Sequence, residues 1–285
     1  MAAEIPFTKM HGCENDYVVV DGVHQDVADP NAFARAANDR RRGVGADGLL
    51  LALPSDVADL RMRMFNVDGS EAEMCGNGLR CLVKFAWERG LVPARPSGTV
   101  ETGAGVLGYE LRDPADGRVD RITIDMGRPR LERAEIPMLG DDGPVRDEAL
   151  AVGDRQLEIT AVSMGNPHAV SWVDDVDAWP LEEVGRLVEH HASFPKRTNA
   201  EFVEVLSRSE VRQRTWERGC GETLACGTGA CAVVVAGVET GRLAREVLVH
   251  LRGGDLEIRY GEDGHVWKTG PAVEVFQGTW PALRR

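Results

Sequence analysis

Residues 222–232 read ETLACGTGACA, a Cys-Gly-x-Gly turn followed by small, apolar residues of helical character. Glycine-rich turns that open a helix often bind phosphate, because the helix N-terminus offers unpaired N–H groups and the positive end of its dipole. A phosphate loop also needs Lys and Ser or Thr after the glycines, where this turn has Ala230 and Cys231. The feature that needs an explanation is therefore the thiol of Cys226, directly before the first glycine.

A second copy of the motif occurs earlier in the chain, where residues 71–81 read EAEMCGNGLRC. Its cysteine, Cys75, lies 151 residues before Cys226, the difference between 226 and 75. Further residues correspond at this offset, namely Gly76/Gly227, Gly78/Gly229, Glu88/Glu239, Gly90/Gly241, Glu71/Glu222, Asn66/Glu217, Phe65/Trp216, Arg63/Arg214 and Asn15/Asn166. One register over more than seventy residues predicts two copies of one structural unit, related by approximate two-fold symmetry.

Hydrophobic periodicity predicts many short strands and a few longer helices. The predicted helices are Pro30–Arg41, Asn77–Arg89, Leu181–His190 and Gly229–Thr240. The predicted strands are Tyr17–Val20, Leu49–Ala52, Arg61–Phe65, Arg121–Asp125, Ala169–Val173, Phe202–Val205, Val211–Trp216, Val247–Leu251, Leu256–Arg259 and Ala272–Phe276. This mixture indicates an α+β fold, in which each copy places a strand before the Cys-Gly-x-Gly turn and a helix after it.

The composition excludes several classes of partner. The net charge of −13 repels phosphate backbones and anionic membranes, so we expect no nucleic-acid partner. The longest apolar run, near 230–238, is far shorter than the roughly 18 residues of a membrane-spanning helix. The N-terminus, MAAEIPFTKM, has neither the basic head nor the apolar core of a secretory signal. We therefore expect a cytoplasmic protein with reduced thiols and no membrane partner.

Neither a metal nor an organic cofactor is expected. The six cysteines form no Cys-x-x-Cys pair, and no histidine stands at zinc-finger spacing from them, so most are expected to be small buried hydrophobes. A pyridoxal phosphate enzyme needs a lysine for its Schiff base. The chain has four lysines, and none lies in a motif that resembles such a site.

Two cysteines at helix N-termini suggest a specific chemistry. The helix end is expected to lower the thiol pKa from about 8.5, which gives a thiolate near neutral pH. The neighbouring N–H groups can bind a carboxylate. Two such ends facing each other would hold one carboxylate with a sulfur on each side of the α-carbon. One thiolate would remove the α-proton, and the opposite thiol would protonate the other face. This hypothesis makes Cys75 and Cys226 the two bases of a cofactor-independent epimerase or racemase.

Six motifs resemble those of the diaminopimelate epimerase family, in the same order and over about Phe7 to Phe276. They are KMHGCENDYVVVD, GVGADGLL, FNVDGSEAEMCGNGLRC, VSMGNPHAV, RTNAEFVEV and WERGCGETLACGTGACA. The resemblance implies two similar domains, each a small β-barrel-like sheet around a central helix. We expect them at residues 1–126 and 127–273, with 274–285 completing the first. It also implies an isomerase that interconverts LL-2,6-diaminopimelate and meso-diaminopimelate in lysine and peptidoglycan precursor biosynthesis, and a homodimer.

The resemblance also implies roles for individual residues. Cys75 and Cys226 match the catalytic cysteines, and His168 and Glu217 match groups that assist them. The residues that match the substrate-binding positions are Asn15, Asn66, Gly76, Asn77, Asn166, Asn199, Glu217, Arg218, Gly227 and Thr228. Within this set, the amides of Gly76, Asn77, Gly227 and Thr228 would bind the reacting carboxylate. Asn66 and Glu217 would bind the α-ammonium, and Asn15, Asn166, Asn199 and Arg218 the distal amino acid. In the first motif, Cys13, Glu14 and Tyr17 stand where the common pattern has Leu, Gly and Phe.

Two other functions are compatible with the sequence. The first is a racemase of another amino acid, such as histidine or proline, on the same scaffold. A smaller substrate would leave the asparagines and Arg218 unpaired, which disfavours it. The second is a non-catalytic amino-acid-binding protein or a redox-sensing dithiol protein. Neither activity requires two symmetric cysteines at helix N-termini.

Overall fold

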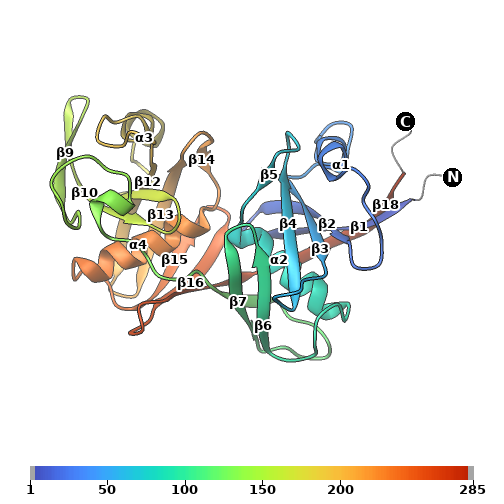
Figure 1. Cartoon of the computed structure of the whole chain (residues 1–285). Helices are drawn as coiled ribbons and strands as arrows, with labels where there is room; N and C mark the ends of the chain where they lie inside the picture. Colours follow the sequence, from blue (N-terminus) through green and yellow to red (C-terminus); the bar gives the residue numbers. More distant parts are fainter. Residues whose placement is uncertain (1–3, 282–285) are drawn as a thin grey trace. The chain divides into compact units, whose positions relative to one another are not determined.

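The computed structural model describes residues 4–281, and the chain divides into two compact units. The first contains the residues up to Asp125 and those from Thr269 onward, and the second is Met126–Lys268. The chain thus passes into the second unit once and returns. Strands and helices are mixed in both units, which confirms the predicted α+β class (Figure 1). None of the helices in residues 4–281 is long and apolar enough to cross a membrane.

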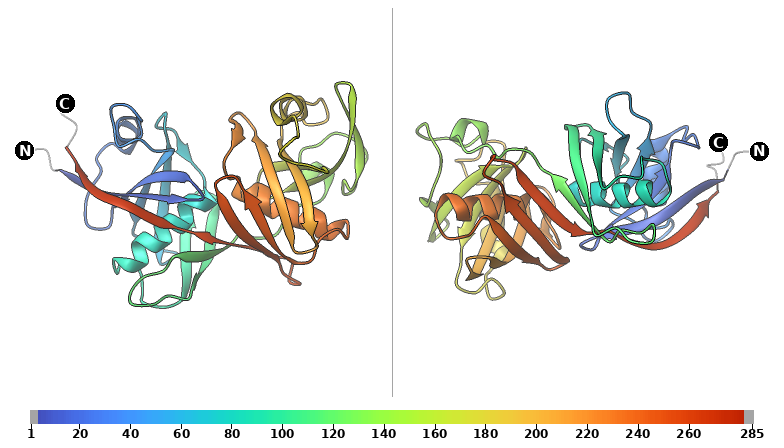
Figure 2. Two further views of the ribbon diagram at one scale, coloured as in Figure 1. Left: turned by 180° about the vertical axis from the view of Figure 1, so that it is seen from behind. Right: turned by 90° about the horizontal axis from the view of Figure 1, so that it is seen from below.

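The first unit contains helices α1 (Pro30–Ala37) and α2 (Gly76–Glu88). Its strands are β1 (Ile5–Gly12), β2 (Asn15–Asp21), β3 (Gly48–Leu53), β4 (Leu60–Asn66), β5 (Glu71–Ala72), β6 (Ser97–Thr102), β7 (Gly105–Arg112), β8 (Arg121–Asp125) and β18 (Val273–Trp280). Strand β18 pairs antiparallel with β1, although the two come from opposite ends of the chain (Figure 2).

The second unit contains helices α3 (Leu181–Glu189) and α4 (Gly227–Glu239) and a short 3-10 helix (Arg133–Glu135). Its strands are β9 (Glu148–Val152), β10 (Arg155–Ser163), β11 (Pro167–Trp172), β12 (Asn199–Ser207), β13 (Glu210–Glu217), β14 (Gly221–Thr223), β15 (Glu246–Leu251) and β16 (Gly254–Tyr260). Strand β17 (Val266–Pro271) begins in this unit and ends in the first.

The two units have the same order of strand pairing. In the first, β1 pairs with β2, β2 runs parallel to β3, β3 pairs antiparallel with β4, and β4 is parallel to β6. In the second, the corresponding pairs are β10 with β11, β11 parallel to β12, β12 with β13, and β13 parallel to β15. Helices α2 and α4 begin and end 151 residues apart, so the offset found in the sequence is also an offset in structure.

All four predicted helices are present, with small shifts at their ends. The largest shift is in α1, which ends at Ala37 instead of Arg41. The carboxylate of Asp39 accepts hydrogen bonds from the N–H groups of Arg41 and Arg42, and this turn replaces the last helical turn. The ten predicted strands are also present. Eight others were not predicted, namely β1, β5, β6, β7, β9, β10, β14 and β17. Several of these are two or three residues long or contain Gly and Pro, which are depleted in strands.

Helices α2 and α4 are the central helices of their units, and strands surround them in Figure 1. An apolar residue occupies nearly every side of α4, as expected of a helix buried on all sides. Helix α2 is buried from Gly76 to Ala86 although it contains Arg80 and Lys84. Arg80 donates to the carbonyl oxygen of Pro271 at 3.1 Å, and Lys84 contacts Glu88 at 2.7 Å. These partners make the burial of both cations possible.

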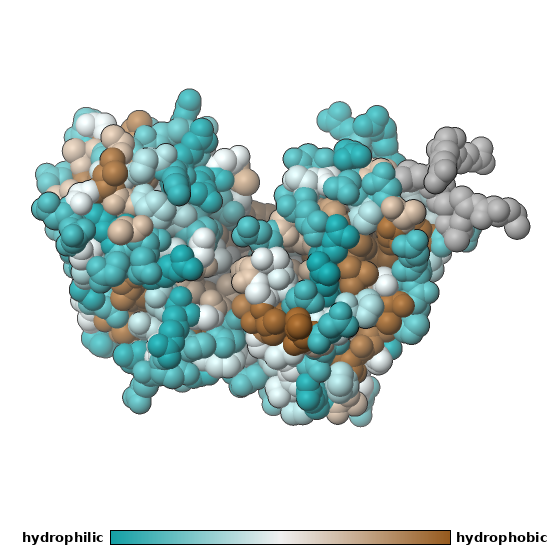
Figure 3. Space-filling view, viewed as in Figure 1, coloured by the Kyte–Doolittle hydropathy of each residue, from teal (hydrophilic) through white to brown (hydrophobic). Residues whose placement is uncertain are grey.

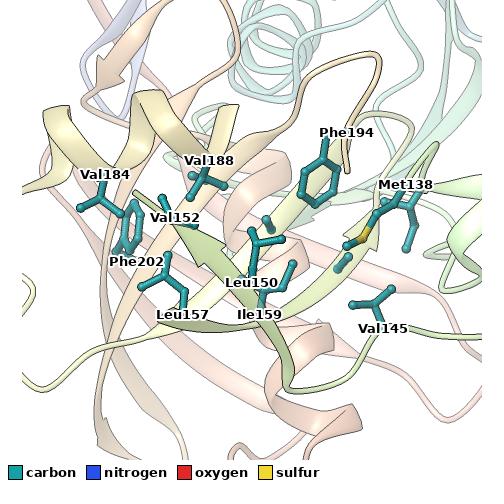
Figure 4. Packing of buried hydrophobic residues seen from close by; sticks show 14 of the residues in the cluster. Met138, Val145, Leu150, Val152, Leu157, Ile159, Val184, Val188, Phe194 and Phe202 are labelled. Carbon is teal, nitrogen blue, oxygen red and sulfur yellow. The ribbon is translucent and has the colours of Figure 1, made fainter. Parts of the chain in front are cut away.

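The smaller helices α1 and α3 cover a second apolar core in each unit. In the second unit, Phe202 of β12 meets Val184 and Val188 of α3, together with residues of β9 and β10 (Figure 4). In the first unit, Val18 and Val20 of β2 pack in the core that contains Phe33 of α1. Successive side chains of a strand point to opposite faces, so the alternate residues of β2 face away from α1. The visible surface in Figure 3 is mostly hydrophilic with scattered apolar patches.

Asp16, at the start of β2, links two cations of the first unit. Its carboxylate lies 2.6 Å from the Lys9 ammonium and 2.8 Å from the Arg40 guanidinium. Burial opposes the charge, but the hydrogen bonds from Arg40 and Lys9 outweigh it and lower the pKa of Asp16 to about 2. A carboxyl whose pKa is lower in the folded than in the unfolded state stabilises the fold above its unfolded pKa. This contribution is lost as the pH falls from about 4 towards about 2.

We therefore expect Asp16→Asn to lower the free energy of unfolding at pH 7 by about 1–2 kcal/mol, because solvent partly screens the pair. The difference between wild type and variant should shrink as the pH approaches 2. Urea unfolding at several pH values measures it, with Asp56→Asn, at an exposed position, as control. A difference that does not change with pH would contradict this account.

Candidate active site

Cys75 and Cys226 occupy the same position in the two units, at the N-cap of the central helix. Both have extended backbone conformation, with φ −139° and ψ 120° for Cys75 and φ −105° and ψ 103° for Cys226. The first residues of α2 are Gly76 and Asn77, and those of α4 are Gly227 and Thr228. N–H groups in the first turn of a helix have no partner within the helix. Each cysteine therefore lies beside amides that are able to bind an anion.

The Cys75 thiol contacts two side chains of β2. Its Sγ lies 3.0 Å from the hydroxyl oxygen of Tyr17 and 3.7 Å from Oδ1 of Asn15. The Tyr17 hydroxyl also donates to Asn15 Oδ1. On its other side, Asn15 donates through Nδ2 to a carboxylate oxygen of Asp47 at 2.7 Å. Burial and the nearby Cys75 raise the pKa of Tyr17 well above its usual value, so the phenol keeps its proton.

The other residues expected near Cys75 are placed differently. Asn77 is buried, and its Oδ1 has no hydrogen-bond partner among the described residues. Asn66 is the last residue of β4, and its Nδ2 donates to the hydroxyl of Ser70 at 3.0 Å. Within residues 4–281, no hydrogen bond joins Asn66 to Cys75. The structure therefore brings Asn15 to the thiol, whereas Asn66, at the end of β4, is bonded to Ser70 in the loop that follows.

The Cys226 thiol is more deeply buried than that of Cys75. Its Sγ accepts a hydrogen bond from the N–H of Gly229 at 3.4 Å and lies 3.6 Å from the Thr228 hydroxyl. Burial raises the pKa of Cys226 well above its usual value, and the carboxylates of Glu217 and Glu201 raise it further. The expectation that the helix end lowers this pKa is thus wrong for Cys226. The hydrogen bonds from Thr228 and Gly229 do lower it, but burial and the two carboxylates outweigh them.

His168 connects Cys226 to a buried hydrogen-bond network. Its Nδ1 lies 2.7 Å from the carboxylate of Glu201, and its Nε2 lies 3.1 Å from Oδ1 of Asn166. Asn166 in turn donates to the Thr228 hydroxyl at 3.3 Å. Both ring nitrogens of His168 thus have a hydrogen-bond partner.

Glu201 is fully buried and each of its oxygens has a partner. Besides His168, it accepts hydrogen bonds from Gln213 at 2.7 Å and Thr215 at 2.5 Å. The ligand atoms of His168, Glu201 and Cys226 lie within 4.8 Å of one another, a spacing that three metal ligands could also have. Within this cluster, His168 and Glu201 are joined by their own hydrogen bond.

Glu217 is the last residue of β13, and Asn199 is the first residue of the neighbouring antiparallel strand β12. Burial raises the pKa of Glu217, against the effect of a 2.5 Å hydrogen bond from Thr223 and of its contact with Cys226. Asn199 donates to the carbonyl oxygen of Pro167 at 2.9 Å and accepts from the N–H of Arg218 at 2.8 Å. The Arg218 side chain is exposed. Asn199 thus fixes the backbone around Arg218, and its amide is already paired.

Among the residues of these networks that the sequence did not point to are Tyr17, Asp47 and Glu201. The repeat contained a signal for the first, because the offset of 151 pairs Tyr17 with His168. It pairs Glu201 with Leu50, an apolar residue, so the offset alone gave no reason to single out Glu201. The only sequence signal for Glu201 was its place in the motif RTNAEFVEV, where an acidic residue stands directly before a predicted strand.

Two corresponding glycines offer a matched test of this packing. A Cβ at Gly229 would lie 2.5 Å from a Glu201 carboxylate oxygen, whereas a Cβ at Gly78 would lie 3.1 Å from a Leu50 methyl. Glu201 has three hydrogen bonds and cannot move aside without breaking them. We expect Gly229→Ala to lower the free energy of unfolding by about 1–3 kcal/mol. Gly78→Ala should change it by less than about 1 kcal/mol, because the helix propensity of Ala offsets the crowding. Urea unfolding measures both, and equal losses would contradict the account.

Comparison with known proteins identifies the family of this chain. The family model described as "Diaminopimelate epimerase" matches residues 7–132 and 160–275. The chain is 58% identical over 276 residues to the diaminopimelate epimerase of Desulforudis audaxviator, covering 96% of this chain and 98% of that protein. It is 54% identical over 278 residues to that of Pelotomaculum thermopropionicum, with coverage of 96% and 98%. To that of Methanococcus maripaludis it is 50% identical over 273 residues, with coverage of 95% and 98%.

Solved structures with low sequence identity share the fold. A hydroxyproline epimerase from Agrobacterium vitis superposes with a TM-score of 0.71 at 17% identity, over 98% of this chain and 94% of that one. A phenazine biosynthesis protein from Bacillus anthracis gives a TM-score of 0.69 at 20% identity, over 97% and 99%. At these identities the likeness concerns the fold alone. The relatives at 50–58% identity and the family match over most of the sequence show that this chain belongs to the diaminopimelate epimerase family.

Proposed function

We propose that this protein is a cofactor-independent epimerase that interconverts LL-2,6-diaminopimelate and meso-diaminopimelate. The observation that carries the proposal is the equivalent position of two cysteines at the N-caps of the central helices. An epimerase must remove a proton from one face of a carbon and deliver one to the other. Two thiols in repeated units supply one acid and one base without any further group. The names of the relatives, at 50–58% identity, support the substrate.

In the proposed reaction, each thiol serves one face of the reacting α-carbon. Burial and two carboxylates favour the protonated form of Cys226, which makes it the acid in the first direction. The Cys75 thiolate then removes the α-proton, and the Cys226 thiol delivers its own proton to the opposite face. Afterwards Cys75 is the thiol and Cys226 the thiolate, which is the form required for the reverse reaction.

The helix N-termini would stabilise the intermediate charge. As the α-proton leaves, negative charge moves onto the substrate carboxylate. Amides of Gly76 and Asn77 in one unit, and of Gly227 and Thr228 in the other, are candidate donors to that carboxylate. Donors that are already oriented towards a developing charge lower the barrier without reorganisation.

We assign the remaining polar groups to the rest of the substrate. Asn66 and Glu217 would bind the α-ammonium, and Arg218 would bind the distal carboxylate with its planar guanidinium. The Arg218 side chain is exposed, and its guanidinium donates a hydrogen bond to the carbonyl oxygen of Lys196 at 3.1 Å. Asn15, Asn166 and Asn199 would contribute to the distal end, with Asn199 acting mainly by fixing the backbone before Arg218.

Three further parts of the proposal concern the protein as a whole. The two compact units would be the two domains expected from the repeat, with β18 completing the first. The protein would act as a homodimer, as the family resemblance implies. It would be cytoplasmic, where the thiols stay reduced.

Incubation with LL-diaminopimelate in deuterated water tests the reaction. We expect mass spectrometry to find deuterium at one α-carbon, together with formation of the meso isomer. Cys75→Ala and Cys226→Ala should each lower turnover by about 10³-fold or more, because each removes one of the two bases. Cys220→Ala, at an exposed cysteine, is the control and should keep full activity.

The same assay separates the alternatives. Turnover of free histidine or proline with no reaction of diaminopimelate would favour a racemase of a different amino acid. Binding without deuterium exchange would favour an amino-acid-binding or dithiol protein. Full activity in both cysteine variants would rule out the two-base reaction.

A further inference from the structure

Tyr17 takes the place in the first unit that His168 takes in the second. The two residues lie 151 positions apart, the difference between 168 and 17, on the corresponding strands β2 and β11. Because side chains alternate along β2, Tyr17 points away from the α1 core and towards α2, where its ring would contact a Cβ at Gly78. Its hydroxyl lies 3.0 Å from the Cys75 thiol. The same strand position thus presents a polar, hydrogen-bearing group near the cysteine in each unit.

A chain of hydrogen bonds fixes the other neighbour of this hydroxyl. The guanidinium of Arg40 donates to Asp47 at 2.7 Å. The Asp47 carboxylate only accepts hydrogen bonds, so the group of Asn15 that faces it at 2.7 Å must be the Nδ2 amide. This orientation leaves Asn15 Oδ1, a pure acceptor, against the Tyr17 hydroxyl. The hydroxyl therefore lies between a fixed acceptor and the thiol.

A hydroxyl in this position can serve both protonation states of the cysteine, since it has one hydrogen to donate and lone pairs to accept. When Cys75 is a thiol, its S–H donates to the Tyr17 oxygen, and the Tyr17 hydrogen goes to Asn15. When Cys75 is a thiolate, rotation of the O–H bond allows Tyr17 to donate to the sulfur. No proton leaves the phenol in either case. A cysteine that alternates between base and acid thus keeps a partner throughout.

We propose that Tyr17 is a positioning residue for Cys75, whose hydroxyl accepts from the thiol and donates to the thiolate in alternate halves of the reaction. This proposal rests on the two-base function proposed above. It differs from a purely structural role, in which the buried aromatic ring fills space beneath α2 and the hydroxyl has no effect on the thiol.

Tyr17→Phe separates the two roles because it keeps the ring and removes the hydroxyl. In a Cys226→Ala background, the rate of Cys75 alkylation by iodoacetamide is followed against pH, with the modified peptide quantified by mass spectrometry. Cys75 is partly exposed, unlike the buried Cys226. A hydrogen bond to a charged group contributes enough to shift an acidity constant by about tenfold. We expect the midpoint of alkylation to move to higher pH and the rate at neutral pH to fall about tenfold.

The kinetic effect is measured with both catalytic cysteines present. We expect Tyr17→Phe to lower kcat for diaminopimelate about 10- to 100-fold in both directions, with little change in KM, because the hydroxyl acts on the thiol. Tyr109→Phe is the matched control. Its phenol is also buried in the first unit, but its hydroxyl has no hydrogen-bond partner among the described residues. It should leave both the alkylation profile and kcat unchanged.

Each outcome decides between the roles. An unchanged alkylation midpoint in Tyr17→Phe overturns the proposal, even if kcat falls, because the effect would not pass through Cys75. A midpoint that moves to lower pH overturns it as well. Failure of the wild-type protein to exchange the α-proton of diaminopimelate would instead refute the proposed function. The alkylation experiment does not depend on that activity, so the two failures are distinguishable.

Discussion

Burial of a whole helix inside each unit is the constraint on which the rest of the structure depends. Helices α2 and α4 are surrounded by strands, so their N-termini are held at fixed positions relative to the strand ends. The amides of the first helical turn need partners from outside the helix. A cysteine at the N-cap makes only weak hydrogen bonds itself, and it leaves those amides available to an anionic ligand. The buried helix therefore fixes both the position of the thiol and the amides that could bind an anion.

The two units keep this backbone arrangement and differ in the side chains around it. Near Cys75 the neighbours are a phenol and an amide, whereas near Cys226 they are an imidazole and two carboxylates. At the position equivalent to Glu201, the first unit has Leu50. The second unit therefore has a buried carboxylate where the first has an apolar residue. Burial of the thiol raises the pKa of Cys226, and the carboxylates of Glu217 and Glu201 add to this effect. A symmetric backbone thus surrounds its two thiols with unequal electrostatic environments.

The repeat made a large part of the fold predictable, because a shared offset needs only local comparison of residues. Helices α2 and α4 and the cysteines before them were identified in this way. Strand β1 was missed because its sequence, IPFTKMHG, contains Pro and Gly, which are depleted in strands. Its pairing with β18 joins residues more than 250 positions apart, and no local pattern reveals that contact. The predicted direction of the Cys226 pKa shift was wrong because the shift depends first on burial of the thiol and then on the carboxylates of Glu217 and Glu201. These are properties of the folded unit, which the Cys-Gly-x-Gly motif does not reveal. Assignments of substrate contacts to Asn66 and Arg218 stay predictions, since they depend on a ligand.

Strand β18 has a consequence for how the protein is made. In the second unit the strand beside β10 is β9, which precedes it directly in the chain. In the first unit the strand beside β1 is β18 (Val273–Trp280), which follows the whole second unit in the chain. All residues of the second unit are therefore synthesised before β18. Until that moment β1 has an unpaired edge, which is prone to pairing with other chains. The unit that begins first is thus the one that folds completely last, and its nascent edge needs protection while the second unit is being made.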